Sequence, residues 1–270
     1  MSALLLDGRT IAREIFDRLK QEIASEKLDV GFAAILVGDD PASHIYIRLK
    51  EKAAKEVGIR FERILLESDT SQEALEATIT ALNQRPDIHA ILLQLPLPSH
   101  LNADAAIIAI NPSKDADGFH PQHTIEPALA QAIMGLIDST GANLQGRSAA
   151  IICNSPDVFA PPIMQSLGNR EVVATAHRPS DDHTQESARA ADILIVAVGQ
   201  PYLITSDWIK PGAMIVDVGI NKKEDTVVGD VSPVVDAIAA WRSPVPGGVG
   251  PMVVATVMQN AVTLARRLKR

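Results

Sequence analysis

Short apolar segments alternate with longer amphipathic stretches along this chain, and that alternation limits its possible folds more than any other feature. In the first part of the chain, strands are predicted at 32–37, 60–67 and 90–95, and helices at 11–23, at 42–57 and at 70–83, the last beginning with a capping box at Thr70 to Glu73. Parallel strands need a crossover connection, which is usually a helix. The strand–helix–strand order therefore predicts a parallel α/β layer.

A second set of elements follows a break near residue 120. It comprises predicted helices at 127–139, around Ile163 and at 253–268, and predicted strands at 149–153, 172–176, 193–198 and 214–218. We therefore predict an α/β protein with two domains. Residues 1–120 and 250–270 form the first domain, and residues 121–249 form a Rossmann-like parallel-sheet domain. The C-terminal helix returns to the first domain.

Charge and cysteine content exclude several classes of protein. The formal net charge is -8 and no long basic run occurs, so we expect no nucleic-acid partner. A single cysteine, Cys153, permits neither an internal disulfide nor a cysteine-based metal site. Charged residues interrupt the first fifteen positions, and no apolar run is long enough to span a bilayer. These features predict a cytoplasmic protein without a membrane partner.

Tyr46 and Lys50 lie four residues apart in a predicted helix, so they share one face of it. A lysine that acts as a base needs a lowered pKa, which partial burial provides. A neighbouring tyrosine can stack on a flat ligand. Spacing alone favours a simpler interpretation, a solvated lysine beside a half-buried tyrosine.

Four sequence segments that occur in a fixed order favour a functional role for Tyr46 and Lys50 instead. Residues 42–50 read ASHIYIRLK, 94–98 read QLPLP, 114–119 read KDADGF and 244–252 read PVPGGVGPM. With GAMIVDVGIN at 212–221, these segments resemble the bifunctional methylenetetrahydrofolate dehydrogenase/cyclohydrolase family over nearly the whole chain. The resemblance implies a tetrahydrofolate derivative as substrate, 5,10-methenyltetrahydrofolate cyclohydrolase activity and a homodimer formed through the nucleotide-side domain.

The resemblance also implies roles for individual residues. Lys50 is the central catalytic group, Gln94 positions it, and Tyr46 packs against the folate. Asp117 binds the pterin ring, whose adjacent N–H donors suit a forked carboxylate acceptor. The implied catalytic residues are Lys50, Tyr46, Gln94 and Asp117, and the implied substrate contacts are Tyr46, Leu95, Asp117, Pro246, Gly247, Gly250 and Pro251.

The implied cyclohydrolase step needs a proton acceptor for water and a proton donor for the leaving nitrogen, and it requires no metal. His120 and His123 are three residues apart, but they lie in a proline-flanked loop rather than on a clear helix. A zinc site is therefore not expected there.

The segment expected to bind NADP departs from the family pattern. Where the family has Gly-Arg-Ser-x-x-Val-Gly-x-Pro, residues 153–161 read CNSPDVFAP. Cys153 and Phe159 replace glycines that allow a tight turn and close approach of the backbone. Asn154 replaces an arginine suited to a 2′-phosphate, and Asp157 adds negative charge at the helix start. These changes predict that NADP binding and dehydrogenase activity are weakened or lost.

Three alternatives stay open. A fully bifunctional enzyme would hold NADP in a remodelled site through Ser155, Arg178 and Ile220. A non-catalytic folate-binding protein would keep the fold without turnover, but it would not need Lys50 paired with Gln94. An unrelated small-molecule dehydrogenase is disfavoured by the four folate-side segments and the altered turn.

Overall fold

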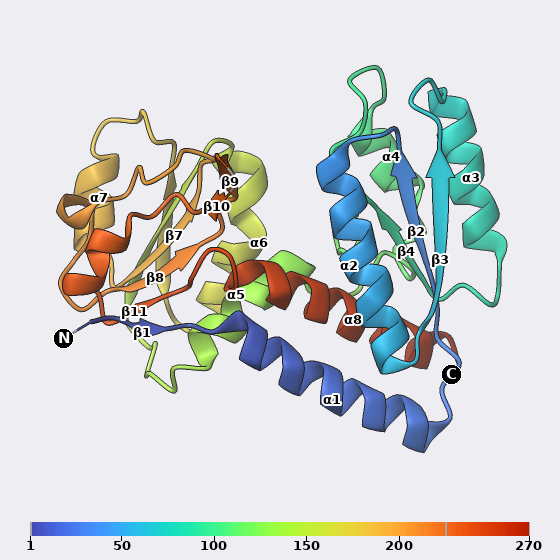
Figure 1. Cartoon of the computed structure of the whole chain (residues 1–270), viewed down its shortest axis with the longest axis horizontal. Coiled ribbons are helices and arrows are strands. Elements are labelled where there is room, and N and C mark those ends of the chain that lie inside the picture. The colour runs from blue at the N-terminus through green and yellow to red at the C-terminus, as the bar shows by residue number, and fades with distance from the viewer. Residues whose placement is uncertain (1, 225, 270) are drawn as a thin grey trace. The chain divides into compact units, whose positions relative to one another are not determined.

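The structure, a computed structural model, describes residues 2–224 and 226–269 (Figure 1). The chain divides into two units. Residues 13–128 and 254–270 form one, called here the three-stranded unit, and residues 1–12 and 129–253 form the other, called the six-stranded unit. Both units are built on parallel strands, so the predicted α/β class is confirmed. The return of the C-terminal helix to the N-terminal α/β unit is confirmed as well.

The three-stranded unit has the sheet order β3-β2-β4, and all of its strand pairs are parallel. The central strand β2 is buried along its whole length, as expected for a parallel strand covered on both faces. The elements are β2 (Gly31–Val37), α2 (Pro41–Val57), β3 (Arg60–Leu66), α3 (Gln72–Gln84), β4 (Ala90–Leu93), α4 (Ala103–Ala109), most of α1 (Gly8–Glu26) and most of α8 (Val249–Leu268).

Local signals set the ends of α2 and α3. The Asp40 carboxylate accepts the Ser43 N–H at 2.8 Å and caps α2, which ends at Gly58 in a left-handed conformation with φ 90°. For α3 the N-cap lies one residue later than predicted. Ser71, rather than Thr70, is the N-cap, because the Thr70 hydroxyl donates to a preceding carbonyl instead.

The six-stranded unit has the sheet order β1-β11-β8-β7-β5-β6, with every neighbouring pair parallel. Its strands are β1 (Leu4–Leu5), β5 (Ser148–Cys153), β6 (Val173–His177), β7 (Ile193–Ala197), β8 (Met214–Asp217) and β11 (Trp241–Arg242). The remaining elements are helices α5 (Ala128–Asp138), α6 (Pro156–Gly168) and α7 (Thr184–Ala190), 3-10 turns at Ser206–Trp208 and Pro233–Ala237, and the antiparallel hairpin β9 (Asn221–Lys223) and β10 (Thr226–Val228).

Two buried carboxylates organise the loops at the carboxyl ends of β7 and β8. Asp230 accepts the N–H groups of residues 198, 199 and 200 at 2.6, 3.0 and 2.9 Å. Asp217 accepts the N–H groups of Gly219, Asp230 and Val231. Gly219 is required here, because a Cβ at that position would lie 2.2 Å from Asp230 Cγ. Two neighbouring strand ends are thus tied together by side chains of acidic residues.

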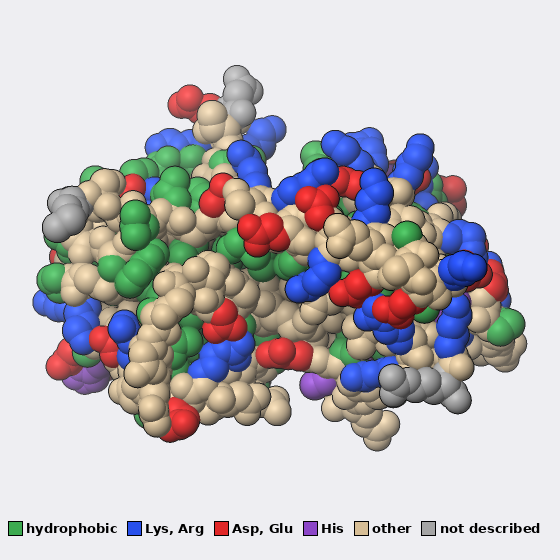
Figure 2. Space-filling model, turned by 90° about the horizontal axis from the view of Figure 1, so that it is seen from below, with side chains coloured by type: hydrophobic (Ala, Val, Ile, Leu, Met, Phe, Trp, Pro, Cys, Tyr) green, Lys and Arg blue, Asp and Glu red, His purple; other side chains and the backbone are tan. Residues whose placement is uncertain are grey.

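Surface charge is mixed. On the face shown in Figure 2, acidic and basic side chains are interspersed. Among the described residues, no helix has the length and apolarity required to cross a membrane.

Candidate active site

The buried pair Lys50 and Gln94 lies at the centre of the candidate site. Lys50 is carried by α2 and Gln94 directly follows β4, and each side chain is only 8% exposed. Lys50 Nζ donates to Gln94 Oε1 at 2.8 Å, and Gln94 Nε2 donates to the Leu95 carbonyl at 2.7 Å. The amide therefore gives the lysine a neutral acceptor and is itself held by the backbone.

Burial shifts the pKa values of two oppositely charged groups toward each other. Burial lowers the pKa of Lys50 below its ordinary value, while the nearby Asp117 opposes that shift. Burial raises the pKa of Asp117 to about 6; attraction to Lys50 works against this rise, and repulsion from Asp115 adds to it. Asp117 still keeps partial access to solvent. Both groups can therefore change protonation state closer to neutral pH than in water.

The two histidines near Asp117 are engaged in loop contacts. His120 Nδ1 accepts the N–H of Gln122 at 2.9 Å, and His123 Nδ1 lies 3.0 Å from the His120 carbonyl. Across the part of the chain that the structure describes, no group of three or more His, Cys, Asp or Glu residues could hold a metal ion.

Tyr46 lies one helical turn before Lys50 on α2, and its ring is partly exposed. Burial of the other part raises the pKa of its hydroxyl. The flanking residues Ile45 and Leu49 are largely exposed. An aromatic ring beside the buried lysine provides a flat apolar surface for a ring ligand.

The predicted loop residues Pro246, Gly247, Gly250 and Pro251 belong to the six-stranded unit, whereas Lys50, Gln94 and Asp117 belong to the three-stranded unit. Gly247 has φ +123°, a conformation that favours glycine. Gly250 and Pro251 lie in the first turn of α8, where proline is tolerated. Their contact with a substrate stays a prediction.

At the candidate nucleotide site, the side chains of Cys153 and Asn154 in the altered turn make contacts within the protein. Cys153 ends β5 and is only 1% exposed. The side-chain amide of Asn154 donates to the Val198 carbonyl at 2.7 Å, linking the ends of β5 and β7. Ser155 is the exposed N-cap of α6 and makes no side-chain cap hydrogen bond. The strand–turn–helix geometry of a dinucleotide site is therefore present.

Arg178, which the sequence indicated for a remodelled NADP site, lies beside that turn, and its pairing with Asp157 was not predicted. Arg178, directly after β6, donates from Nη2 to Asp157 in the first turn of α6 at 3.2 Å. Both side chains are well exposed. Ile220 follows β8 and is also exposed. Because the strands are parallel, Ser155, Arg178 and Ile220 all follow strand ends at the same edge of the sheet.

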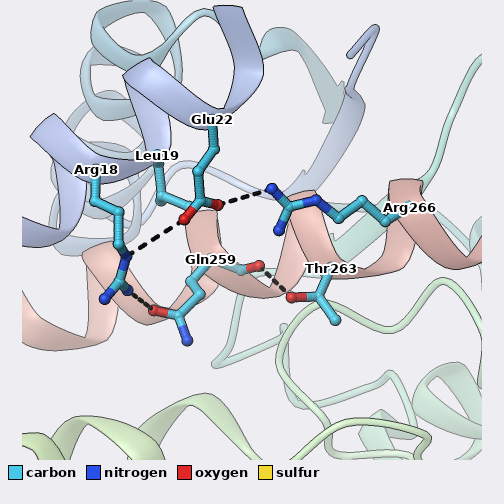
Figure 3. A pocket seen from close by; sticks show the side chains of 6 residues that line it. All are labelled: Arg18, Leu19, Glu22, Gln259, Thr263 and Arg266. Atoms are coloured by element: carbon cyan, nitrogen blue, oxygen red, sulfur yellow. Dashed lines mark hydrogen bonds and ion pairs between the residues drawn. The ribbon is translucent and has the colours of Figure 1, made fainter. Parts of the chain in front are cut away.

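A separate hollow of about 350 Å³ lies between α1 and α8 within the three-stranded unit (Figure 3). It is lined by Arg18, Leu19, Glu22, Gln259, Thr263 and Arg266. Its charged groups are already paired: Arg18 Nη2 donates to Gln259 Oε1 at 2.8 Å, and Arg266 Nη2 donates to Glu22 Oε2 at 2.8 Å. None of the predicted site residues lines this hollow, so it is not part of the candidate site.

One unit has a Rossmann-like parallel sheet, and the other has a buried lysine–glutamine pair. These two features are typical of two-domain enzymes that combine a nucleotide-binding fold with a separate catalytic unit. Family comparison narrows that class. Residues 6–117 match the tetrahydrofolate dehydrogenase/cyclohydrolase catalytic domain, and residues 127–269 match the NAD(P)-binding domain of the same proteins. This chain belongs to the tetrahydrofolate dehydrogenase/cyclohydrolase family.

Individual relatives agree along almost their full lengths. The bifunctional protein FolD of Xanthomonas axonopodis pv. citri is 44% identical, over 98% of this chain and 92% of that protein. The crystal structure of FolD from Trypanosoma brucei, complexed with NADP cofactor and inhibitor, superposes with a TM-score of 0.94 at 33% identity, over 100% of this chain and 99% of that one. The Campylobacter jejuni FolD structure gives a TM-score of 0.93 at 35% identity, over 98% and 99%. The predicted family is confirmed, whereas the predicted loss of NADP binding finds no support among these relatives.

Proposed function

We propose that this protein is a bifunctional 5,10-methylenetetrahydrofolate dehydrogenase and 5,10-methenyltetrahydrofolate cyclohydrolase, with Lys50 as the acid–base group for the folate. The observation that carries this proposal is the buried Lys50–Gln94 hydrogen bond of 2.8 Å, electrostatically coupled to Asp117. Burial of a lysine beside a neutral amide costs free energy, and a protein that only binds its ligand gains nothing in return. The same arrangement is useful for proton transfer near neutral pH.

In the cyclohydrolase step, water adds to the cationic carbon that bridges two folate nitrogens. Neutral Lys50 accepts the proton released by the water, and its lowered pKa makes the neutral form accessible. One carbon–nitrogen bond of the resulting carbinol then breaks: the lysine returns the proton to the leaving nitrogen, and the hydroxyl proton is released to solvent as the formyl C=O forms. The product is 10-formyltetrahydrofolate. Gln94 orients the amine, and the Asp117 carboxylate accepts the N–H donors of the pterin ring.

The decay of methenyltetrahydrofolate absorbance tests this role of Lys50. We expect purified protein to accelerate the decay and Lys50→Met to lose roughly a hundredfold or more of the catalysed rate, the usual size of an acid–base contribution. Lys52→Met is the matched control, because it removes an exposed lysine from the same helix. If the wild-type protein does not accelerate the decay, the protein is not a cyclohydrolase, and a folate-binding protein without turnover is the remaining interpretation. Equal loss in both variants would contradict the proposed role of Lys50.

The dehydrogenase half requires NADP, which when bound supplies a hydride acceptor. The residues present fit that group in four respects. The start of α6, beside the exposed N-cap Ser155, carries the positive end of the helix dipole and so favours a pyrophosphate, and Arg178 offers an exposed guanidinium at the strand end where a 2′-phosphate is read. Asp157, which would otherwise repel phosphate, is paired with that arginine. Ile220 provides an exposed apolar side chain at the same sheet edge.

Equilibrium titration with NADP⁺ and NAD⁺ tests the cofactor half without relying on turnover. We expect Arg178→Ala to weaken NADP⁺ binding by about tenfold or more and to leave NAD⁺ binding unchanged, because only NADP⁺ carries the 2′-phosphate. Arg189→Ala, which removes an arginine bonded to the Asp207 carbonyl, is the control. If neither nucleotide binds at millimolar concentration, the dehydrogenase half of the proposal is wrong and only the cyclohydrolase activity remains proposed.

A further inference from the structure

A buried side chain from the C-terminal helix contacts the segment that carries Asp117. Asn260, on α8, is 3% exposed, and its Nδ2 donates to the Ala116 carbonyl at 2.9 Å. The two residues are 144 positions apart in sequence but belong to the same unit. A buried side-chain amide bonded to the peptide group immediately before Asp117 restrains the orientation of that peptide, and with it the direction of the Asp117 side chain.

Asp117 is restrained from other sides as well. Asp115, which is buried, accepts the Asp117 N–H at 3.1 Å and the His120 N–H at 2.7 Å. The Asp117 carbonyl accepts the Ala128 N–H at 2.9 Å, and the Ala128 carbonyl in turn accepts the hydroxyl of Thr256 from α8 at 3.0 Å. The backbone on both sides of the carboxylate is therefore fixed.

The turn that follows is equally confined. Gly118 has φ +74°, and a Cβ at that position would lie 2.8 Å from the Cα of Pro127. A side chain at position 118 would therefore push this segment away from residue 127, and glycine allows the close approach. A displacement of about 1 Å at a substrate-positioning group is enough to weaken a forked contact severely.

We propose that Asn260 is a positioning residue for the Asp117 carboxylate, and thereby sets the affinity of the site for the pterin ring. This inference rests on the proposed function, in which Asp117 binds that ring. Asn260 does not touch the substrate. It acts by fixing the Ala116–Asp117 peptide so that both carboxylate oxygens face the adjacent N–H donors of the ligand.

The test is steady-state cyclohydrolase kinetics on Asn260→Leu, which keeps the size of the side chain and removes the donor. We expect KM to rise about tenfold, the size of effect that follows the loss of a buried hydrogen bond such as that to the Ala116 carbonyl, with kcat within about twofold of wild type. Equilibrium binding of tetrahydrofolate is measured beside it and is expected to weaken by the same factor. Thr263→Val, which removes a hydroxyl bonded within α8 to the Gln259 carbonyl, is the matched control and is expected to leave KM unchanged.

Asp115→Asn is a second test, for use if Asn260→Leu does not fold. It changes the acceptor of the Asp117 N–H and leaves α8 unaltered. One of its two accepting oxygens becomes a donor, and we expect the same rise in KM. In an Asp117→Asn background, Asn260→Leu is expected to add less than twofold, because the group that it positions is already gone.

The failures are distinguishable. If Asp117→Asn itself leaves KM unchanged, the assignment of Asp117 to the pterin ring is wrong, and the proposed function loses that contact. If Asp117→Asn raises KM but Asn260→Leu and Asp115→Asn do not, the positioning inference alone is overturned. A fall in kcat with constant KM in Asn260→Leu would also contradict it.

Discussion

Gln94 shows how a neutral side chain can govern the charge of its neighbour. Its carbonyl oxygen accepts a hydrogen bond from Lys50 without contributing a negative charge, so burial remains the dominant influence on the pKa of the lysine. A carboxylate in the same place would favour the protonated amine, which cannot act as a base.

Gln94→Glu should therefore suppress cyclohydrolase activity at neutral pH. The new carboxylate raises the pKa of Lys50, so we expect at least about a tenfold loss at pH 7 and partial recovery as the pH rises. Gln94→Met, similar in size and uncharged, serves as the control for the lost hydrogen bond. The pH–rate profiles of the two variants decide the matter: an alkaline shift confined to Gln94→Glu is expected, and identical profiles would contradict it.

The pKa of Asp117 makes a prediction about stability. Its folded-state value of about 6 exceeds the ordinary 3.8, so between these values the folded state binds more protons than the unfolded state. The contribution of this carboxyl to stability is therefore present below about pH 4 and is lost as the pH rises through 6. Relative to Asp117→Asn, we expect the wild type to lose on the order of 2 kcal/mol of unfolding free energy over that window. Urea denaturation at several pH values measures the difference, and parallel curves would show that the shift is absent.

At this scale local sequence patterns predicted the residue types, and the contact between Lys50 and Gln94 was implied only by the family resemblance. Tyr46 and Lys50 could be paired by helical spacing, and their functional roles came from the family resemblance. The Lys50–Gln94 bond depends on α2 packing beside the end of β4, which no local pattern specifies. The Arg178–Asp157 pair escaped prediction for the same reason. In the sequence Asp157 has no oppositely charged neighbour, because its partner Arg178 directly follows β6, the strand beside β5.

Among the elements, accuracy followed the strength of local signals. The expected start and stop of α2 lay within one residue of those observed, because Asp40 and Gly58 are strong caps. β1 and β11 have only two residues each, and they exist through pairing with distant strands. Their sequences carry no periodicity that could predict them. The start of α8 at Val249 was missed because a glycine and a proline occupy its first turn.

The loops at the ends of β7 and β8 should depend strongly on Asp230. This fully buried carboxylate accepts three consecutive backbone N–H groups, at residues 198–200. Asp230→Ala would leave those donors without this acceptor, and we expect a loss of about 3–5 kcal/mol in the free energy of unfolding. Asp157→Ala, at an exposed site, is expected to cost less than about 0.5 kcal/mol. Chemical denaturation of both variants tests this; similar losses would contradict the structural role of Asp230.

On the scale of the whole molecule, the path of the chain was harder to predict than its elements. Strand–helix order indicates α/β units, but it does not say to which unit a terminal segment belongs. Here residues 1–12 group with 129–253, and residues 254–270 group with 13–128, so the divisions fall inside α1 and α8. A helix has the same local signals on both sides of such a division.

The homodimer implied by the family resemblance can be tested at a strand edge. β6 is one of the two edge strands of the six-stranded sheet, and Val173 on it is 71% exposed. An exposed apolar edge strand favours association, and a lysine there opposes it. We expect wild-type protein to sediment at twice the monomer mass and Val173→Lys to shift toward monomer, while Val234→Lys, at another exposed valine of the unit, does not. A wild-type monomer at micromolar concentration would contradict the dimer.

The hydrogen bond between Asn260 and the Ala116 carbonyl has a consequence for biosynthesis. After residues 1–12, the ribosome translates residues 13–128, then the whole of 129–253, and only then the part of α8 that completes the three-stranded unit. Every strand of both sheets is thus translated before the three-stranded unit receives its last helix. Under the proposed function, the segment that positions Asp117 for the pterin is completed by the last element to be translated.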